Sequence, residues 1–161
     1  MIDILRKMTY GHYILTARKV GDELKTRDKD YIAAGTVNWA TQTSFHPPMI
    51  AVAVEHDADL NETIDYSEHF TLQLLGEDNR EMVNAFGTKS NVNGDEINGY
   101  PFKKVGGQAI LQNTVGYVIC EVKETVNAGD HRLYIGEVID HKHDNNRPVI
   151  HTDSVAMQYA D

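Results

Sequence analysis

Length, composition and charge limit what this chain can be. Its 161 residues are enough for one domain whose hydrophobic core needs neither a disulfide nor a structural metal. A formal net charge of -9, from 15 basic and 24 acidic residues, argues against nucleic acid or an anionic membrane as the main partner. The single cysteine cannot form an internal disulfide and the first residues form no long apolar run, so we expect a soluble cytoplasmic protein.

The first half of the chain shows the alternation of β-strands in three places, with helical patterns beside them. The strands are expected at residues 10–19, 31–37 and 49–55. A short amphipathic helix is expected over 2–8, before these strands, and another helix over 59–68, after them. In the third strand Ala51 and Ala53 share one face, and side chains this small leave room for something bulky beside the strand.

The second half of the chain predicts one more helix and longer strands. Its strands are expected at residues 70–76, 114–126 and 131–143, with short closing segments at 147–151 and 155–159. The helix is expected over 78–87 and ends at Gly87. Gly129 and Asp130 separate the two long strands and suit a hairpin turn.

The first long strand carries apolar side chains on both faces. Val118 and Cys120 alternate with Tyr117 and Ile119, so one face alone cannot be the core. Many strands and few, short helices favour a mainly β fold, an antiparallel barrel with peripheral helices. A second subunit would cover the face that carries Tyr117 and Ile119, which predicts a homodimer. No repeat or linker divides the chain, so we expect one domain over 1–161.

A polar segment interrupts the strand patterns at residues 38–45. It lies within "GTVNWATQTSFHPPMIAVAV" (35–54), and its candidate binding residues are Asn38, Trp39, Ala40, Thr41, Thr43, Ser44 and Phe45. Backbone amides outside a β-ladder can point at a ligand, and short side chains let the ligand come close. This composition suits the edge of a heteroaromatic ring or a phosphate. The alternative is a polar turn before the two prolines.

A second polar loop follows the helix expected over 78–87. Lys89 supplies a positive charge, Ser90 supplies a hydrogen-bond donor, and Asn91 follows them, so this loop can hold an anion such as a phosphate. The alternative is a solvated loop after the end of a helix. The loop lacks P-loop spacing, and the chain contains no G-x-G-x-x-G fingerprint, which argues against a Rossmann domain.

Histidines are the remaining candidates for chemistry. His131 opens a long strand directly after a tight turn, where an imidazole can donate or accept a hydrogen bond; the alternative is a rim residue without a task. His141 and His143 lie two apart without a third partner at a diagnostic spacing, so we expect no metal site. No arrangement typical of a hydrolase is found, and Cys120 is expected to be a small buried hydrophobe.

Three segments, in this order and at about the usual separations, resemble the flavin-reductase-like FMN-binding split-barrel family. They are the segment at 35–54, the helix end "VNAFGTKS" (83–90) and "AGDHRLYIGEVIDH" (128–141). The opening "MTYGHYILTA" (8–17) also resembles the members related to the flavin domain of high-molecular-weight rubredoxin. The likeness covers nearly the whole chain.

The resemblance implies a Greek-key split barrel that binds FMN, with FAD as the other candidate, and uses NADH or NADPH as electron donor. It implies that residues 38–45 surround the isoalloxazine ring and reach the flavin phosphate, and that residues 89–91 add phosphate contacts. His131 would lie at the nicotinamide side. The implied reaction is hydride transfer from NAD(P)H to flavin, with the electrons passed on to oxygen or to a partner such as a rubredoxin or a monooxygenase. Members of the family usually form homodimers.

Two positions depart from the family pattern. Trp39 stands where many members have a small residue, so it is expected to stack on the flavin or to narrow the nicotinamide pocket. Asn91 replaces the glycine that often follows the serine of the phosphate loop. These departures leave a second hypothesis open, an FMN-bound electron-transfer protein or flavin-binding module without nicotinamide activity.

Overall fold

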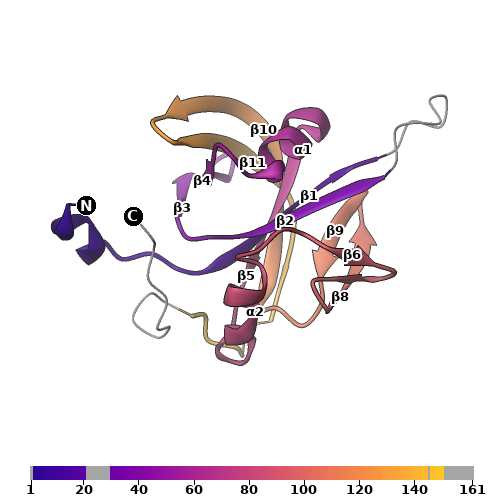
Figure 1. Cartoon of the computed structure of the whole chain (residues 1–161). Helices are drawn as coiled ribbons and strands as arrows, with labels where there is room; N and C mark the ends of the chain where they lie inside the picture. The colour runs from indigo at the N-terminus through magenta and orange to yellow at the C-terminus, as the bar shows by residue number, and fades with distance from the viewer. Residues whose placement is uncertain (1, 21–29, 145, 151–161) are drawn as a thin grey trace.

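The computed structural model describes residues 2–20, 30–144 and 146–150, and the statements below concern these residues. Seven antiparallel strands form the main sheet, in the spatial order β2-β1-β5-β10-β11-β4-β3 (Figure 1). Their bounds are β1 Tyr13–Lys19, β2 Tyr31–Val37, β3 Ala40–Ser44, β4 Met49–Glu55, β5 His69–Leu74, β10 Gly116–Ala128 and β11 His131–His143. The predicted mainly β fold with antiparallel strands is confirmed.

The two edge strands of this sheet are neighbours in the sequence. β2 and β3 lie at opposite ends of the strand order, and Asn38 and Trp39 alone join them. The chain therefore passes directly from one edge of the sheet to the other, and the sheet curls into a barrel. At this junction the backbone oxygen of Trp39 accepts a hydrogen bond of 2.9 Å from the backbone N–H of Ala53, which ties the link to β4.

The long hairpin of β10 and β11 forms as predicted, with β10 shifted by two residues relative to 114–126. Gly129 in its turn has φ +64°, a conformation that glycine adopts without strain. β10 pairs with β5 without a register shift, so Ile119 and Cys120 lie on opposite faces of the strand, and both side chains are buried. The prediction that Ile119 needs a second subunit to cover it is wrong, because a single chain already leaves it only 3% exposed.

The inner core fills the barrel and is closed by α1 (Asp59–Ser67). Leu60 and Ile64 of this helix pack with side chains of the barrel strands such as Leu15, Phe70 and Tyr134. Cys120 belongs to the same cluster and is fully buried, as predicted. Burial raises the pKa of the Cys120 thiol to about 12, so this side chain acts as a packing group and not as a nucleophile.

An outer core lies on the other face of the barrel wall, under α2 (Arg80–Ala85) and a small second sheet. The strands of that sheet are β6 Val92–Asn93, β7 Glu96–Ile97, β8 Tyr100–Val105 and β9 Gln108–Leu111. The fully buried Gln73 joins the two layers: its amide donates to the backbone oxygen of Ile14 at 2.9 Å, and its side-chain oxygen accepts from the backbone N–H of Leu111 at 2.9 Å. The chain thus covers much of the outside of its own barrel.

The small sheet is absent from the sequence-based expectations for a physical reason. Its strands have two, two, six and four residues, which is too short for a clear periodicity. Glycines with positive φ angles separate them, at Gly94, Gly99, Gly106 and Gly107. β3 was likewise expected to be part of a polar loop. It is an exposed edge strand, and its polar residues show no alternation with apolar ones.

The helices follow the predicted positions with different boundaries. α1 ends at Ser67, one residue before the predicted end, since Glu68 adopts φ +59°. The helix expected over 78–87 begins as a 3-10 helix, η2 (Glu77–Asn79), and continues as α2. The helix expected over 2–8 is also a 3-10 helix, η1 (Asp3–Lys7), which buries none of its residues and lies apart from the barrel (Figure 1).

The C-terminal expectations are met in part. Val149 forms a β-bridge with Gly76, and Ile150 is buried in the outer core, so the segment at 147–151 does pack on the barrel as far as it is described. The segment expected at 155–159 lies outside the described residues. Among the helices of the described ranges, none has the length and apolar character that a membrane crossing requires.

Candidate functional site

A pocket of about 620 Å³ opens beside the junction of β2 and β3. Its lining comes from β2 and the link after it, the end of β4, the corner that leads into α1, the loop after α2 and the first residue of β11. The segment at 34–39 and the loop at 86–89, far apart in the sequence, face the same space. The curvature of the sheet is what brings these segments together.

The β2 side of the pocket is open because Gly35 has no side chain. A Cβ atom at this position would lie 3.1 Å from Cδ1 of Leu60, tighter than ordinary van der Waals contact. On either side of Gly35, the outer edge of β2 is satisfied by the loop after α2: the backbone N–H of Thr36 donates to the backbone oxygen of Phe86 at 3.0 Å. The backbone of an edge strand therefore lines a ligand-sized space without exposing unpaired groups at Thr36.

The predicted anion loop lies at this wall, and its three residues have different tasks. Lys89 is exposed and lines the pocket. Ser90 turns away: its hydroxyl donates to the backbone oxygen of Ala34 at 2.9 Å and accepts from the backbone N–H of Ala34 at 2.8 Å. The backbone N–H of Asn91 donates to the side-chain oxygen of Asn98 at 2.7 Å. Ser90 and Asn91 thus hold the loop, and Lys89 is presented to the pocket.

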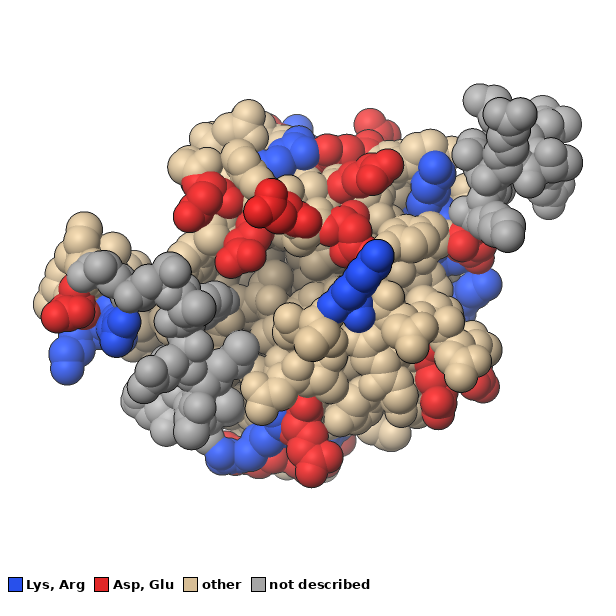
Figure 2. Space-filling model, in the orientation of Figure 1, with Lys and Arg blue, Asp and Glu red and all other residues tan. Residues whose placement is uncertain are grey.

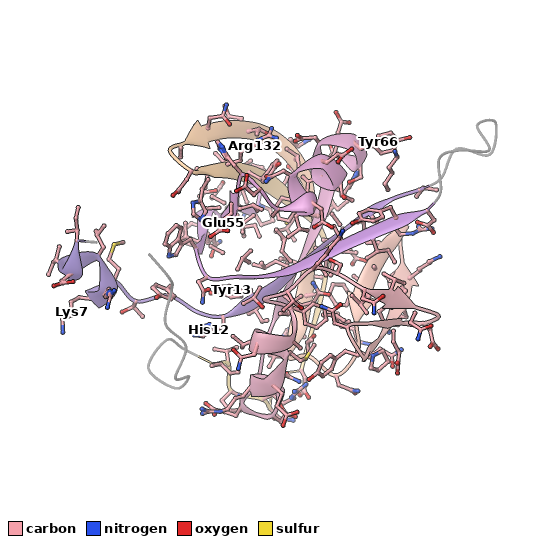
Figure 3. The ribbon with its side chains drawn as sticks, viewed as in Figure 1. Lys7, His12, Tyr13, Glu55, Tyr66 and Arg132 are labelled. Atoms are coloured by element: carbon pink, nitrogen blue, oxygen red, sulfur yellow. The ribbon has the colours of Figure 1, made fainter. Side chains whose placement is uncertain are left out.

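The side chain of Asn38 points away from solvent, although the residue lines the pocket. Its amide donates to the backbone oxygen of Gly11 at 3.0 Å, and its nitrogen lies 2.6 Å from Nδ1 of the buried His12. Burial lowers the pKa of His12, so its imidazole is neutral and Nδ1 can accept this hydrogen bond. In the view of Figure 3, His12 and Glu55 lie on opposite sides of the strand pair β1–β2. The side chain of Asn38 is therefore held by the two residues that directly precede β1.

Trp39 and His131 form a pair at the opposite wall. Their ring centroids lie 4.6 Å apart with an interplanar angle of 40°, and Trp39 is 46% exposed. Nδ1 of His131 lies 2.6 Å from a carboxylate oxygen of Asp130, and this hydrogen bond holds the pKa of Asp130 below its ordinary value. Asp130 therefore fixes the orientation of the imidazole, with Nδ1–H as donor. Asp130 was not among the predicted site residues, although its position directly before His131 was a signal.

The remaining predicted residues of the polar segment lie on β3 or, for Phe45, directly after it, and do not line this pocket. They are Ala40, Thr41, Thr43, Ser44 and Phe45, and Phe45 is 79% exposed. β3 pairs with β4 on one side and is the edge of the sheet on the other. A role of these five residues in binding stays a prediction, and none of them lines the pocket that Trp39 lines.

An acidic corner forms the wall that the sequence analysis did not anticipate. Glu55, Asp57 and Asp59 line the pocket between the end of β4 and the start of α1. Figure 2 shows Asp and Glu side chains gathered along one side of a hollow in this face of the molecule. Lys89 is the only lysine or arginine that lines the pocket within the described residues. The signal in the sequence was the dense acidic run "EHDAD" (55–59) between a strand and a helix.

Comparisons with known proteins agree on one family. The model of the flavin reductase like domain matches residues 5–159 of this chain. The high molecular weight rubredoxin of Moorella thermoacetica is 31% identical over 139 residues, which cover 84% of this chain and 57% of that protein. The ferric-chelate reductase (NAD(P)H) of Archaeoglobus fulgidus is 25% identical over 163 residues, covering 99% of this chain and 87% of that protein.

A solved structure supports the fold. The flavin reductase PheA2 in its native state superimposes with a TM-score of 0.78 at 23% identity, covering 100% of this chain and 99% of that chain. The expected split-barrel fold is thereby confirmed. The chain spans little more than half the length of the rubredoxin relative, 57%. With a family model that matches nearly from end to end, the chain belongs to the flavin reductase like domain family.

Proposed function

We propose that this chain is an NAD(P)H-dependent flavin reductase that binds FMN in the pocket beside β2. The observation that carries the proposal is that three different surfaces line the same pocket. They are the backbone of β2 at Gly35, which has no side chain, the amino group of Lys89, and the aromatic pair of Trp39 and His131. A planar ring, a phosphate and a second aromatic group each find a suitable surface there.

The residues present fit a flavin. A volume of about 620 Å³ lies within the range usual for small-molecule sites, and Gly35 leaves open a surface that any Cβ would fill. The backbone from Ala34 to Asn38 would lie along the ring, and Lys89 would pair with the phosphate of FMN. Bound FMN would supply the hydride acceptor, and the protein would bind, orient and shield it. FAD is the other candidate flavin.

Trp39, His131 and Asp130 would act on the nicotinamide side. The bond between His131 Nδ1 and Asp130 sets the direction of the imidazole, and the indole of Trp39 lies against it. This pair would orient the nicotinamide ring by contact and by the second ring nitrogen of His131, and would exclude water from the reacting atoms.

An FMN-bound electron-transfer module is the second candidate. The similarity to a high molecular weight rubredoxin, of which this chain matches 57%, favours it, because a redox protein of greater length contains a region like this one. In that case the protein would receive electrons from a partner and would not oxidise a nicotinamide productively. A rubredoxin or a monooxygenase would be the partner class in either case, and a cytoplasmic location suits both.

We also propose a homodimer, with the open edge of β3 in the contact. Phe45, directly after β3, is 79% exposed and Trp39, directly before it, is 46% exposed, and β3 has no neighbour at its outer edge within the described residues. Sedimentation equilibrium with and without FMN tests the proposal, using Phe45→Asp as the disrupting variant. A wild-type protein that stays monomeric at roughly tens of micromolar would contradict it.

Two measurements test the proposed activity. Equilibrium dialysis against FMN should give stoichiometric binding at micromolar concentrations. Anaerobic addition of NADH or NADPH should then bleach the visible flavin absorbance within the time of a turnover. Binding without bleaching by either nicotinamide would favour the electron-transfer module, and no binding of FMN or FAD would refute both candidates.

A further inference from the structure

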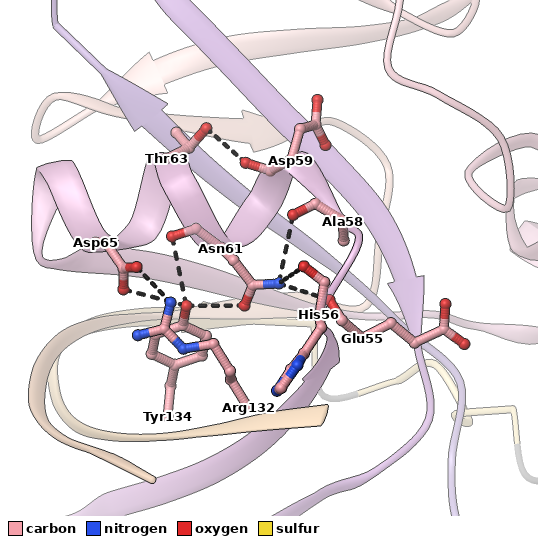
Figure 4. Close-up of polar contacts among 9 residues, drawn as sticks. All are labelled: Glu55, His56, Ala58, Asp59, Asn61, Thr63, Asp65, Arg132 and Tyr134. Atoms are coloured by element: carbon pink, nitrogen blue, oxygen red, sulfur yellow. Dashed lines mark hydrogen bonds and ion pairs between the residues drawn. The ribbon is translucent and has the colours of Figure 1, made fainter. Parts of the chain in front are cut away.

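The acidic corner is held rigidly by one buried side chain. Asn61, 6% exposed, directs its amide nitrogen at three backbone oxygens: Glu55 at 2.5 Å, His56 at 3.2 Å and Ala58 at 3.3 Å (Figure 4). These oxygens belong to the turn between β4 and α1. An amide has two hydrogens to share among them, so the turn is clamped from inside. Side chains on the turn therefore project from a fixed backbone.

Asn61 is itself anchored to β11. The hydroxyl of the fully buried Tyr134 donates to the side-chain oxygen of Asn61 at 2.8 Å, which orients the amide with its nitrogen toward the turn (Figure 4). Asp65 of α1 also lies beside this hydroxyl and forms an ion pair with Arg132. Tyr134 lies three residues after His131 on the same strand, so one network spans the acidic corner and the strand that carries His131.

A second bond ties the corner to the same hairpin. The backbone N–H of His56 donates at 3.0 Å to the backbone oxygen of Asp130, the residue that orients His131. In the strand register, Glu55 lies opposite His131. The carboxylates of the corner and the proposed nicotinamide-orienting histidine thus share a rigid support.

The charge of this corner bears on which nicotinamide enters. NADPH differs from NADH by a phosphate that carries about two negative charges at neutral pH. Three carboxylates line the corner side of the pocket, and Lys89 on the other wall would be occupied by the flavin phosphate. Within the described residues, no further lysine or arginine lines the pocket to receive a second phosphate. The carboxylates would repel the extra phosphate of NADPH, and that phosphate would find no positively charged partner in the pocket. Both effects would weaken the binding of NADPH.

We propose that Glu55, Asp57 and Asp59, held in place by the positioning residues Asn61 and Tyr134, make the enzyme select NADH over NADPH. The inference rests on the proposed flavin reductase activity. The carboxylates act directly on the incoming nucleotide. Asn61 and Tyr134 act through the turn, by keeping the carboxylates at the pocket.

Steady-state kinetics with both nucleotides test the selection. The wild-type protein should show kcat/KM for NADH at least about 10-fold above that for NADPH at low ionic strength, and added salt should narrow the ratio because it screens the repulsion. Asp57→Asn and Glu55→Gln should each lower the ratio about 3-fold or more, through a lower KM for NADPH. The matched control Glu81→Gln removes an exposed carboxylate of α2 outside the pocket, and should leave the ratio unchanged.

Tyr134→Phe tests the positioning role, since it removes one hydroxyl and keeps the ring in the core. We expect the NADH to NADPH ratio to fall about 2- to 3-fold, with kcat for NADH changed less than KM for NADPH. A purely structural role would lower the melting temperature and leave the ratio as it was. That result would overturn the positioning claim.

The outcomes separate this inference from the activity on which it rests. Equal use of NADH and NADPH by the wild-type protein, or a preference for NADPH, would overturn the selection and leave the reductase standing. If FMN is not reduced by either nucleotide, equilibrium dialysis of NAD⁺ and of NADP⁺ against the FMN-loaded protein tests the selection by binding alone. Tighter binding of NAD⁺ would support the selection without turnover, and equal binding or no binding would refute it.

Discussion

The two walls of the pocket are built in opposite ways. The Lys89 wall is a loop attached from outside to the edge of β2, through Ser90 on Ala34. The acidic wall is a turn clamped from inside, through the buried Asn61 and Tyr134. A loop held by a few surface-side bonds can adjust to a ligand, whereas a turn tied to the core keeps its charges in place. We infer that affinity for flavin depends on the first wall and discrimination between nucleotides on the second.

The largest expected effect belongs to the Lys89 wall. Lys89→Ala should weaken FMN binding by about 1–3 kcal/mol, roughly 5- to 150-fold, because a charge-assisted bond to the phosphate is lost. Riboflavin lacks the phosphate, so its affinity should change little. Fluorescence titration with both ligands measures the difference, and Lys103→Ala on β8, outside this pocket, is the control. Equal losses for the two ligands would remove Lys89 from the phosphate site.

Substitution of His131 tests the proposed nicotinamide side of the pocket. His131→Ala should leave the FMN dissociation constant within about 3-fold and slow the reduction of flavin by NADH about 10-fold or more, because the imidazole orients the donor and not the flavin. Stopped-flow reduction measures the rate. His141→Ala, an exposed histidine of the same strand, should leave it unchanged. Normal reduction in the His131 variant would leave the residue without a catalytic role.

Ser90 offers a smaller and more local test of the loop. Ser90→Ala removes both bonds to Ala34 and should lower the unfolding free energy by about 1 kcal/mol, with a several-fold loss of FMN affinity. Ser67→Ala is a matched control, since the hydroxyl of Ser67 also bonds the backbone of one residue, His69, and neither residue lines the pocket. It should cost similar stability and leave FMN affinity intact. If Ser90→Ala leaves the affinity for FMN unchanged, the two hydrogen bonds between Ser90 and Ala34 do not contribute to the phosphate site.

The last prediction concerns pH and His12, which supports the side chain of Asn38. Burial lowers the pKa of His12 from its ordinary value near 6.5. Below about pH 6.5, His12 is therefore protonated in the unfolded chain and still neutral in the folded chain. Stability should therefore be lost as the pH falls through that region, by at most about 1.4 kcal/mol per pH unit from this group. Urea unfolding at pH 7.5 and 5.5 measures the slope. His12→Gln should flatten it, and an unchanged slope would assign the effect to other groups.

Much of the site could be predicted from the sequence where the signal is local. The strand at 31–37, the strand at 49–55 and the start of a strand at His131 match the structure, because alternation and turn residues act within a few positions. Of the two alanines expected to leave room for something bulky, Ala53 lines the pocket, whereas Ala51 is buried and does not. The sequence could not show that Asn38 and Trp39 line the pocket whereas residues 40–44 form an exposed edge strand, because polar residues are typical of both places.

Sequence alone determined the long strands of the main sheet, the polar segment after β2 and the family to which these features point. Tertiary structure decided which residues meet. The curled sheet places Lys89 and Glu55 around one space, although 34 positions separate them in the sequence. It also turns the hydroxyl of Ser90 to β2 and clamps an acidic turn with Asn61 and Tyr134. Such contacts depend on strand order and on buried hydrogen bonds between distant residues, which no local pattern records.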